Sequence, residues 1–228
     1  MINQKFMKYC YKLLISTSIF FAGCPVETNT GNSDVREKTR PKDRQTSSFS
    51  TTEITLDGEP CGGELDIFVF NTSVRIQTSP KDSINKVAAK IVNSINSNIS
   101  LQKQGIKGET EDSKLILTNV QEYDVYICTT DKGINIPEKP MNLVCNVEGG
   151  HFIVFRWKNP NGFYDRIHIV ESGIPIAEGL PGTSTSFKYD YLSPHGNIYE
   201  GKHIYRVTGV KRGTPSCPAI CEVYLKVP

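Results

Sequence analysis

The order of apolar and polar residues predicts two kinds of secondary structure from residue 53 onward. Short runs in which apolar and polar residues alternate, such as residues 153–157 and 166–170, indicate strands that bury one face. One longer stretch, residues 84–95, differs because its apolar residues recur at helical spacing. These residues are Ile84, Val87, Ala88, Ile91 and Ile95. We therefore expect one amphipathic helix among many strands.

The first folded segment, residues 53–136, contains this helix. Ser79-Pro80-Lys81-Asp82 has the composition of a helix start, with Ser79 as the capping residue. The other apolar runs have strand character and lie at residues 65–70, 74–78, 106–107, 115–118 and 125–128. The segment is predicted to be a small α+β domain in which one main helix packs on an antiparallel sheet.

The second folded segment, residues 137–228, follows a stiff Pro-flanked hinge at Pro137-Glu138-Lys139-Pro140. It contains short strand-like runs with turn signals between them and no helical periodicity, which predicts an all-β sandwich. Its runs lie at residues 153–157, 166–170, 184–189, 204–208 and 220–225. In the second of these, Ile167 and Ile169 are expected to face inward, and His168 therefore outward.

Residues 140–227 resemble a fibronectin type III domain. The resemblance rests on Pro140-Met141-Asn142-Leu143, Trp157 two residues after Phe155, Asn159-Pro160, Tyr164-Asp165-x-Ile167-x-Ile169, Leu192, and Tyr205-x-Val207. It implies an immunoglobulin-like sandwich of seven strands used for spacing or recognition. The segment before it has a fainter resemblance to small units of phage-tail and flagellar-hook surface proteins, carried by Ala88-Ala89-Lys90-Ile91, Gly105-Ile106 and Leu115-x-Leu117-Thr118. That resemblance implies no activity.

The N-terminal residues have the layout of a secretory signal, because residues 13–23 are apolar or small and follow Lys5, Lys8 and Lys12. The run is shorter than the roughly 20 residues of a membrane-spanning helix. Phe21-Ala22-Gly23-Cys24 resembles the lipobox of bacterial lipoproteins. The resemblance implies that residues 1–23 are removed, that Cys24 is acylated, and that the protein is exported and lipid-anchored in the bacterial cell envelope. An ordinary cleaved signal with a cysteine near its end is the alternative.

Residues 24–52 are rich in Ser, Thr, Asn and charges of both signs, so they are predicted to be a disordered tether. Three of the 26 basic residues lie in the predicted signal, which leaves 23 basic against 24 acidic residues in the mature chain. Such a balance gives no general attraction to polyanions, and no nucleic-acid partner is expected. Contact with a membrane is expected only through the lipid anchor.

Five cysteines remain once Cys10 and Cys24 are set aside, and an exported chain meets conditions in which disulfides persist. The positions of Cys61 and Cys128 at the two ends of one sheet predict a disulfide between them. Cys145 and Cys221, in the first and last strands of the sandwich, predict a second. Cys217 is left over, although it lies close enough to replace Cys221. No second pair of Cys or His at ligand spacing accompanies Cys217 and Cys221, so neither a metal nor another cofactor is expected.

No catalytic motif distinguishes the histidines, although all four lie in the second segment: His151, His168, His195 and His203. A histidine beside Asp165, Glu171, Asp190 or Glu200 has the groups for acid–base chemistry, but spacing selects none of them. The chain has no HExxH sequence, nucleophile elbow or phosphate-binding loop. Residues 159–165 carry oxygen donors loosely spaced like a calcium loop, for which ordinary turn chemistry is the simpler explanation. We expect no enzymatic activity.

Aromatic residues are the better indication of a binding surface. Those in or near predicted loops of the sandwich are Phe163, Tyr164, Tyr189, Tyr191 and Tyr199. The alternative is that about half of them fill the core. The sequence thus favours a non-catalytic surface lipoprotein that displays binding domains for a protein or glycan partner. A structural spacer or assembly subunit of a surface complex is the alternative.

Overall fold

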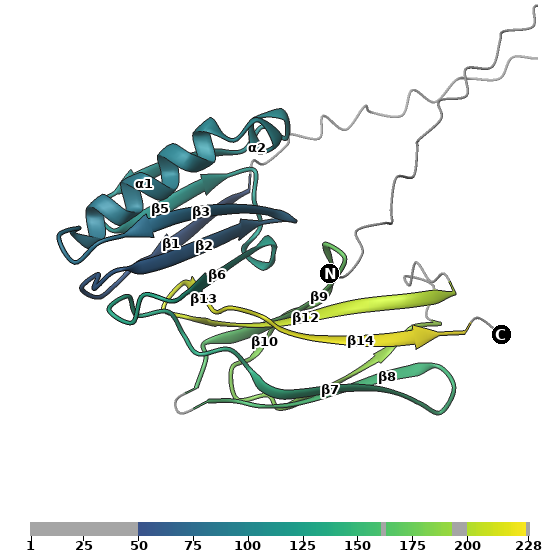
Figure 1. Cartoon of the computed structure of the whole chain (residues 1–228). Coiled ribbons are helices and arrows are strands. Elements are labelled where there is room, and N and C mark those ends of the chain that lie inside the picture. The colour runs from purple at the N-terminus through teal and green to yellow at the C-terminus, as the bar shows by residue number, and fades with distance from the viewer. Residues whose placement is uncertain (1–49, 161–162, 193–199, 227–228) are drawn as a thin grey trace, which may run out of the picture. The chain divides into compact units, whose positions relative to one another are not determined.

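The computed structural model describes residues 50–160, 163–192 and 200–226 (Figure 1). The predicted signal peptide, Cys24, most of the predicted tether, His195 and Tyr199 lie outside these residues. The described residues belong to one compact unit and form two hydrophobic cores. We call residues 50–136 the α+β region and residues 137–226 the sandwich. The domain boundaries given by the sequence stay predictions.

Two three-stranded antiparallel sheets build the α+β region, where the sequence predicted one sheet. The first has the order β1 (Thr51–Thr55), β5 (Lys114–Thr118), β4 (Lys107–Glu111). The second has the order β3 (Thr72–Thr78), β2 (Gly63–Val69), β6 (Val125–Thr129), and the short 3-10 helix η1 (Glu122–Asp124) leads into β6. Alternation fixes which residues face the core: in β2 these are Leu65, Ile67 and Val69.

The main helix α1 (Ile84–Ser97) covers the strands of the α+β region and is followed by the short α2 (Ile99–Lys103) (Figure 1). Its buried residues are Val87, Ala88, Ile91, Val92 and Ile95, so the helical spacing read from the sequence is confirmed. These side chains join both sheets in one core, which is how a single helix holds two sheets together.

The predicted helix cap is wrong by four residues. Ser83 is the cap, and its Oγ accepts a hydrogen bond from the Lys86 N–H at 3.2 Å. The Asp82 carboxylate instead accepts from the Ser79 N–H at 3.0 Å, so residues 79–82 form a separate turn before the helix. Asp82 also pairs with Lys86 and Lys90, whose hydrogen bonds lower its pKa to about 2.

The first strand, β1, begins at Thr51, within the last two residues of the segment predicted as a tether. The register of β1 with β5 pairs Thr51 with Thr118 and Thr55 with Lys114. Thr52 is buried, and its hydroxyl donates to the carbonyl of Val120 at 2.6 Å. β-branched threonines suit a strand once a partner strand is available, although their polarity resembles that of the preceding segment.

The sandwich consists of two facing antiparallel sheets (Figure 1). One has the order β11 (Ser186–Asp190), β8 (Phe152–Lys158), β7 (Met141–Glu148). The other has the order β10 (Ile174–Pro181), β9 (Arg166–Glu171), β12 (Gly201–Lys211), with β13 (Thr214–Pro215) and β14 (Ala219–Leu225) both pairing with β12. The sandwich is therefore of the fibronectin type III kind that the sequence predicted. The sequence did not predict β10.

Alternation along β8 and β9 places the expected residues in the sandwich core. Ile153 and Phe155 are fully buried, Trp157 is 5% exposed, and Ile167 and Ile169 of the facing sheet are fully buried. The Trp157 Nε1–H donates to the Asn159 Oδ1 at 2.9 Å, which satisfies the polar atom of the largest side chain in the core.

We expect Trp157→Ala to lower the free energy of unfolding by about 3–5 kcal/mol, because it removes buried apolar surface and leaves a cavity. Thermal and denaturant unfolding of the mature chain measure the loss. Exposed Lys158→Ala on the same strand is the matched control and should change stability little. An unchanged unfolding transition for Trp157→Ala would contradict its place in the core.

Candidate functional site

A disulfide between Cys128 and Cys217 joins the α+β region to the sandwich, with 4.7 Å between the two Cα atoms. The predicted Cys61–Cys128 disulfide is therefore wrong. Ile127 faces the core of the α+β region, so the next residue of β6, Cys128, faces the opposite side. That side meets the chain between β13 and β14, where Cys217 lies.

Cys61 is an exposed free thiol. Its Sγ lies 3.0 Å from an oxygen of Asp131, and its N–H donates to the same oxygen. Asp131 is buried, and it also accepts hydrogen bonds from the Gly62 and Gly133 N–H groups and the Thr78 hydroxyl. Burial alone would raise the pKa of Asp131, but these donors hold it well below its usual range. Asp131 thus connects two loops of the α+β region.

The predicted Cys145–Cys221 disulfide is confirmed, with a Cα–Cα distance of 6.1 Å. It links the first and last strands of the sandwich. Cys217 does not replace Cys221, because it is already paired with Cys128. Two disulfides indicate an extracytoplasmic protein, since thiols in the cytosol are kept reduced.

A partly buried ion pair lies at the same junction. The Glu122 carboxylate accepts hydrogen bonds from the Arg166 guanidinium and from His168 Nε2, the latter at 2.9 Å. Burial by itself would raise the pKa of Glu122, but the bonds from His168 and Arg166 lower it to about 2. Glu122 comes from η1 of the α+β region, and both partners come from β9 of the sandwich.

His168 points away from Ile167 and Ile169, as expected from alternation. That outward face of β9 is covered by η1, which leaves the His168 side chain 6% exposed. Its Nδ1 accepts a hydrogen bond from the Gly179 N–H at 3.2 Å. Because Nδ1 accepts, the hydrogen-bond network assigns the N–H of the ring to Nε2, which donates to Glu122.

Asp124 is a buried carboxyl group at the junction with an oxygen that accepts no hydrogen bond from any described residue. It is 3% exposed, and its Oδ1 has no hydrogen-bond partner in the described part of the chain. Burial raises the pKa of Asp124 to about 6. Nearby Arg206 opposes this rise; its guanidinium lies over the Tyr126 ring, 5.1 Å from the centroid.

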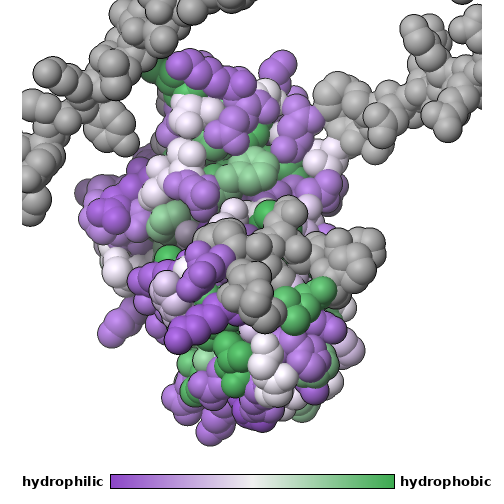
Figure 2. Space-filling model, turned by 90° about the vertical axis from the view of Figure 1, so that its right-hand side faces the viewer, coloured by the Kyte–Doolittle hydropathy of each residue, from purple (hydrophilic) through white to green (hydrophobic). Residues whose placement is uncertain are grey.

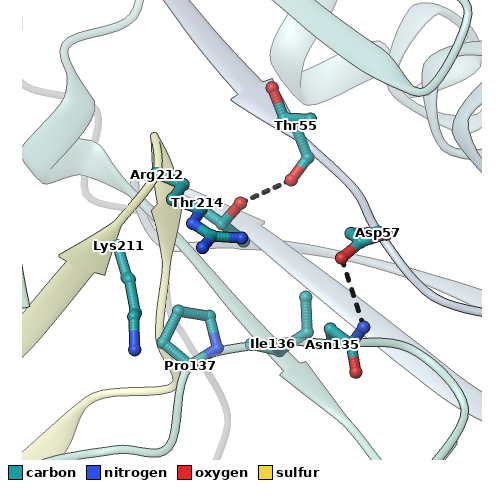
Figure 3. A pocket seen from close by; sticks show the side chains of 8 residues that line it. All are labelled: Thr55, Asp57, Asn135, Ile136, Pro137, Lys211, Arg212 and Thr214. Carbon is teal, nitrogen blue, oxygen red and sulfur yellow. Dashed lines mark hydrogen bonds between the residues drawn. The ribbon is translucent and has the colours of Figure 1, made fainter. Parts of the chain in front are cut away.

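A cavity of about 480 Å³ opens where β1, the segment after Ile134 and the β12–β13 turn meet. Figure 3 shows Lys211 and Arg212 on one side, Asp57 on the other, and Pro137 and Ile136 between them. The complete lining is Thr55, Asp57, Asn135, Ile136, Pro137, Lys211, Arg212 and Thr214. It combines side chains of both regions, and we treat it as the candidate functional site.

Hydrogen bonds fix both walls of this cavity. The Thr214 hydroxyl donates to the carbonyl of Thr55, which attaches the β12–β13 turn to β1 (Figure 3). On the opposite wall the Asn135 N–H donates to the Asp57 carbonyl at 2.8 Å, and the Asn135 amide donates to the Asp57 carboxylate at 3.3 Å. Hydrogen bonds of both the backbone and the side chains therefore hold the two walls of the cavity.

The sequence analysis missed the cavity residues. Lys211-Arg212-Gly213-Thr214 was a usable signal for part of them, because a residue followed by Gly between two strands predicts a tight hairpin turn. Arg212 and Gly213 do have positive φ values, 52° and 75°. Nothing in the sequence indicates that this turn meets Asp57 and Asn135, since that depends on how the two regions join.

The predicted aromatic binding surface is only partly present. Tyr164 and Tyr191 are in the sandwich core, at 5% and 2% exposure, and their hydroxyls donate to the carbonyls of Glu138 and Gly150. Phe163 is 69% exposed, Tyr189 is half-buried, and Tyr199 lies outside the described residues. Figure 2 shows one face of the molecule, on which hydrophobic residues lie in separate groups among hydrophilic ones.

The other two described histidines, His151 and His203, do not line the cavity. His203 is 1% exposed and pairs with Glu171 inside the sandwich, while His151 contacts the Gly149 carbonyl and the Phe152 ring. In the loosely calcium-like segment, Asn159 donates to the carbonyls of Gly182 and Ser184, which is turn chemistry. Among the described residues there is no group of His, Cys, Asp or Glu that could hold a metal ion, and no helix there is long and apolar enough to cross a membrane.

A scan against protein-family models and a search of curated proteins find no match. Solved structures similar to this chain include the spore cortex lytic enzyme SleM of Clostridium perfringens, which is 12% identical with a TM-score of 0.35 over 50% of this chain and 34% of that one. They also include a fibronectin-type protein of Clostridium thermocellum (22% identical, TM-score 0.31, 41% and 96%) and a fibronectin type III domain of human collagen XX (14%, 0.31, 38% and 91%). The chain thus spans about a third of the length of the first of these.

Non-reduced peptide mapping should find Cys128 linked to Cys217, Cys145 linked to Cys221, and Cys61 open to alkylation. We expect Cys128→Ser with Cys217→Ser to lower the free energy of unfolding by about 2–4 kcal/mol, because the disulfide closes a long loop. Cys61→Ser is the control and should leave both linkages intact. A peptide linking Cys61 to Cys128 would contradict the structure.

Asp124→Asn should stabilise the protein at pH 8 and much less at pH 4. The pKa of Asp124 is raised from 3.8 to about 6 on folding, so the folded state holds the proton more tightly and loses stability as pH rises through this window. Each unit is worth about 1.4 kcal/mol, which sets the gain at about 1–3 kcal/mol.

Urea unfolding at the two pH values measures this difference. Asp112→Asn is the matched control, because Asp112 is exposed in a turn with φ of 54°, which Asn adopts readily. Equal effects of Asp124→Asn at both pH values would contradict the burial argument.

Proposed function

We propose that the protein is a non-catalytic envelope lipoprotein that displays the α+β region and the sandwich as one binding unit for a protein or glycan partner. The observation that carries this proposal is the cavity at their junction, which has walls from both regions and two cationic side chains at its rim. Pockets with a few fixed polar groups where two structural units meet are common ligand sites.

A binding role is supported over a catalytic one by where the titratable pairs lie. Both His–carboxylate pairs, His168–Glu122 and His203–Glu171, are buried, with histidine side chains 6% and 1% exposed. Neither pair lines the junction cavity. A general acid or base must reach its substrate, so these pairs serve packing and orientation.

The test of the binding role compares three forms of the mature chain on a glycan array and in pull-down from envelope extracts. The unchanged chain should retain one partner and bind it at one site per protein molecule. The Cys128→Ser, Cys217→Ser variant, in which no disulfide links the two regions, should lose most of this binding. Cys61→Ser should bind normally. No partner above background in either experiment would overturn the proposal.

An assembly role is the second candidate, because the outer face of β12 and β14 exposes apolar side chains. Ile204, Ile220 and Tyr224 are 41%, 59% and 63% exposed. Ile204 pairs with Glu222, which lies between the other two on β14, so the three are neighbours on one face. Native-size analysis after detergent extraction separates the candidates: a stable stoichiometric complex favours assembly, and a lone monomer favours display.

The lipid anchor is proposed from the sequence, and its prediction concerns Cys24. We expect Cys24→Ser to move the protein from the membrane fraction to the soluble fraction, because a serine takes no thioether-linked diacylglyceryl group and two or three acyl chains are needed for stable anchoring. Fractionation after a high-salt wash measures this. A serine variant that still pelleted with membranes would mean that residues 13–21 are an uncleaved anchor.

A further inference from the structure

The two cations at the rim of the junction cavity make no ion pair. Lys211 and Arg212 are exposed, and within the described ranges neither the Lys211 ammonium nor the Arg212 guanidinium has a carboxylate within 4.0 Å. By contrast Lys202 pairs with Glu222, Arg156 with Glu148 and Arg166 with Glu122. The cavity therefore has a localised positive rim, and the one carboxylate of its lining, Asp57, lies on the opposite wall.

These cations project from a backbone that is held in place. The Arg212 N–H donates to the Asp165 carboxylate, and the Thr214 hydroxyl donates to the Thr55 carbonyl. Positive φ values at Arg212 and Gly213 set the tight turn between these contacts. A fixed turn reduces the entropy that is lost when its side chains close on a ligand.

The opposite wall offers hydrogen-bonding groups of a different kind. Asp57 lies across the cavity from Arg212 (Figure 3), and its carboxylate accepts from the Gly58 N–H at 2.8 Å and from the Asn135 amide at 3.3 Å. A carboxylate has about four acceptor sites, so lone pairs remain for hydroxyl donors. The Asn135 amide has a second N–H and an oxygen to offer. This wall suits hydroxyl groups and repels a second anion.

The surface between the walls is apolar. Ile136 and Pro137 are half-buried and lie between Lys211 and Asn135 (Figure 3). Such a surface accommodates the C–H face of a pyranose ring. The volume of about 480 Å³ falls within the range of small-ligand pockets.

From this arrangement we propose that the junction cavity binds an acidic sugar residue of a glycan. The sugar carboxylate pairs with Lys211 and Arg212, hydroxyls on the far side of the ring donate to Asp57 and exchange hydrogen bonds with Asn135, and the ring lies on Pro137. This assignment rests on the proposed binding function and names its ligand class. A ligand that carries negative charge on both sides does not fit, because the Asp57 carboxylate would repel the charge on its side.

The test uses the mature chain with Cys24→Ser, to keep it soluble, and a glucuronic-acid-containing tetrasaccharide followed by calorimetry and NMR. The same tetrasaccharide with its carboxyl groups reduced to alcohols is the ligand control. We expect the acidic form to bind at least about tenfold more tightly, since a charge-assisted hydrogen bond contributes about 1.5–3 kcal/mol. Binding should weaken as salt is added.

Lys211→Ala with Arg212→Ala should weaken binding of the acidic tetrasaccharide by about tenfold or more. The matched control is Lys202→Ala with Arg156→Ala, which removes the same charge from exposed ion pairs away from the cavity and should leave binding unchanged. Asp57→Ala should weaken the acidic and the reduced ligand alike, because it acts on hydroxyls. Native unfolding transitions verify that each variant is folded.

Equal affinity for the acidic and reduced tetrasaccharides, or equal losses in the two double variants, would overturn the acidic-sugar assignment. So would binding confined to phosphate-bearing glycans. These results leave the binding function standing if the array or the pull-down still yields a partner that depends on the Cys128–Cys217 disulfide. Absence of any partner in both of those experiments overturns the function itself.

Discussion

The contact between the α+β region and the sandwich is the constraint on which the other features depend. It combines the Cys128–Cys217 disulfide with the Glu122–Arg166 ion pair and the hydrogen bond between His168 and Glu122. The partly buried Glu122 carboxylate is stabilised because it meets an opposite charge and a second hydrogen-bond donor. The disulfide keeps the two surfaces together, and the ion pair fixes their orientation. Without this contact β9 would have one solvent face, and the cavity would have only half of its walls.

This constraint also explains where reading the sequence succeeded and where it failed. Periodicity within one element gave the α1 face and the inward positions of Ile153, Phe155 and Trp157 correctly, because these depend on local geometry and one core. The expected Cys61–Cys128 disulfide and the expected binding role of Tyr164 failed. His168 points outward as expected, but the sequence did not indicate that the other region covers it. For Cys128 and His168 alike, the outward face of a strand is covered by the other region. No pattern within one strand indicates that a second region covers its outward face.

The aromatic residues show a related limit. Tyr164 follows a turn and has polar neighbours in the sequence, which is typical of a recognition loop. Its ring instead packs on Gly209, where a Cβ would lie 2.3 Å from the ring atoms, and its hydroxyl donates to the Glu138 carbonyl. Tyrosine suits this position because the ring is apolar and the hydroxyl finds a partner at the edge of the core. Composition cannot distinguish a core tyrosine from a binding tyrosine. Tyr164 is a core residue because Gly209, on the neighbouring strand β12, has no side chain and leaves room for the Tyr164 ring.

Charge is distributed unequally over the junction, and this difference points to the cavity as the site of binding. At the buried side, Glu122 is satisfied by two partners, and Arg206 lies over Tyr126 near Asp124. At the rim, Lys211 and Arg212 are fixed by their backbone and face Asp57 across an apolar surface. Exposed lysine and arginine side chains are common and need no explanation when they move freely in solvent. Two of them on one constrained turn, beside a hollow lined by hydrogen-bonding groups, form a preorganised site. We infer that the ligand supplies the anion for these two side chains, because Asp57 lies on the opposite wall.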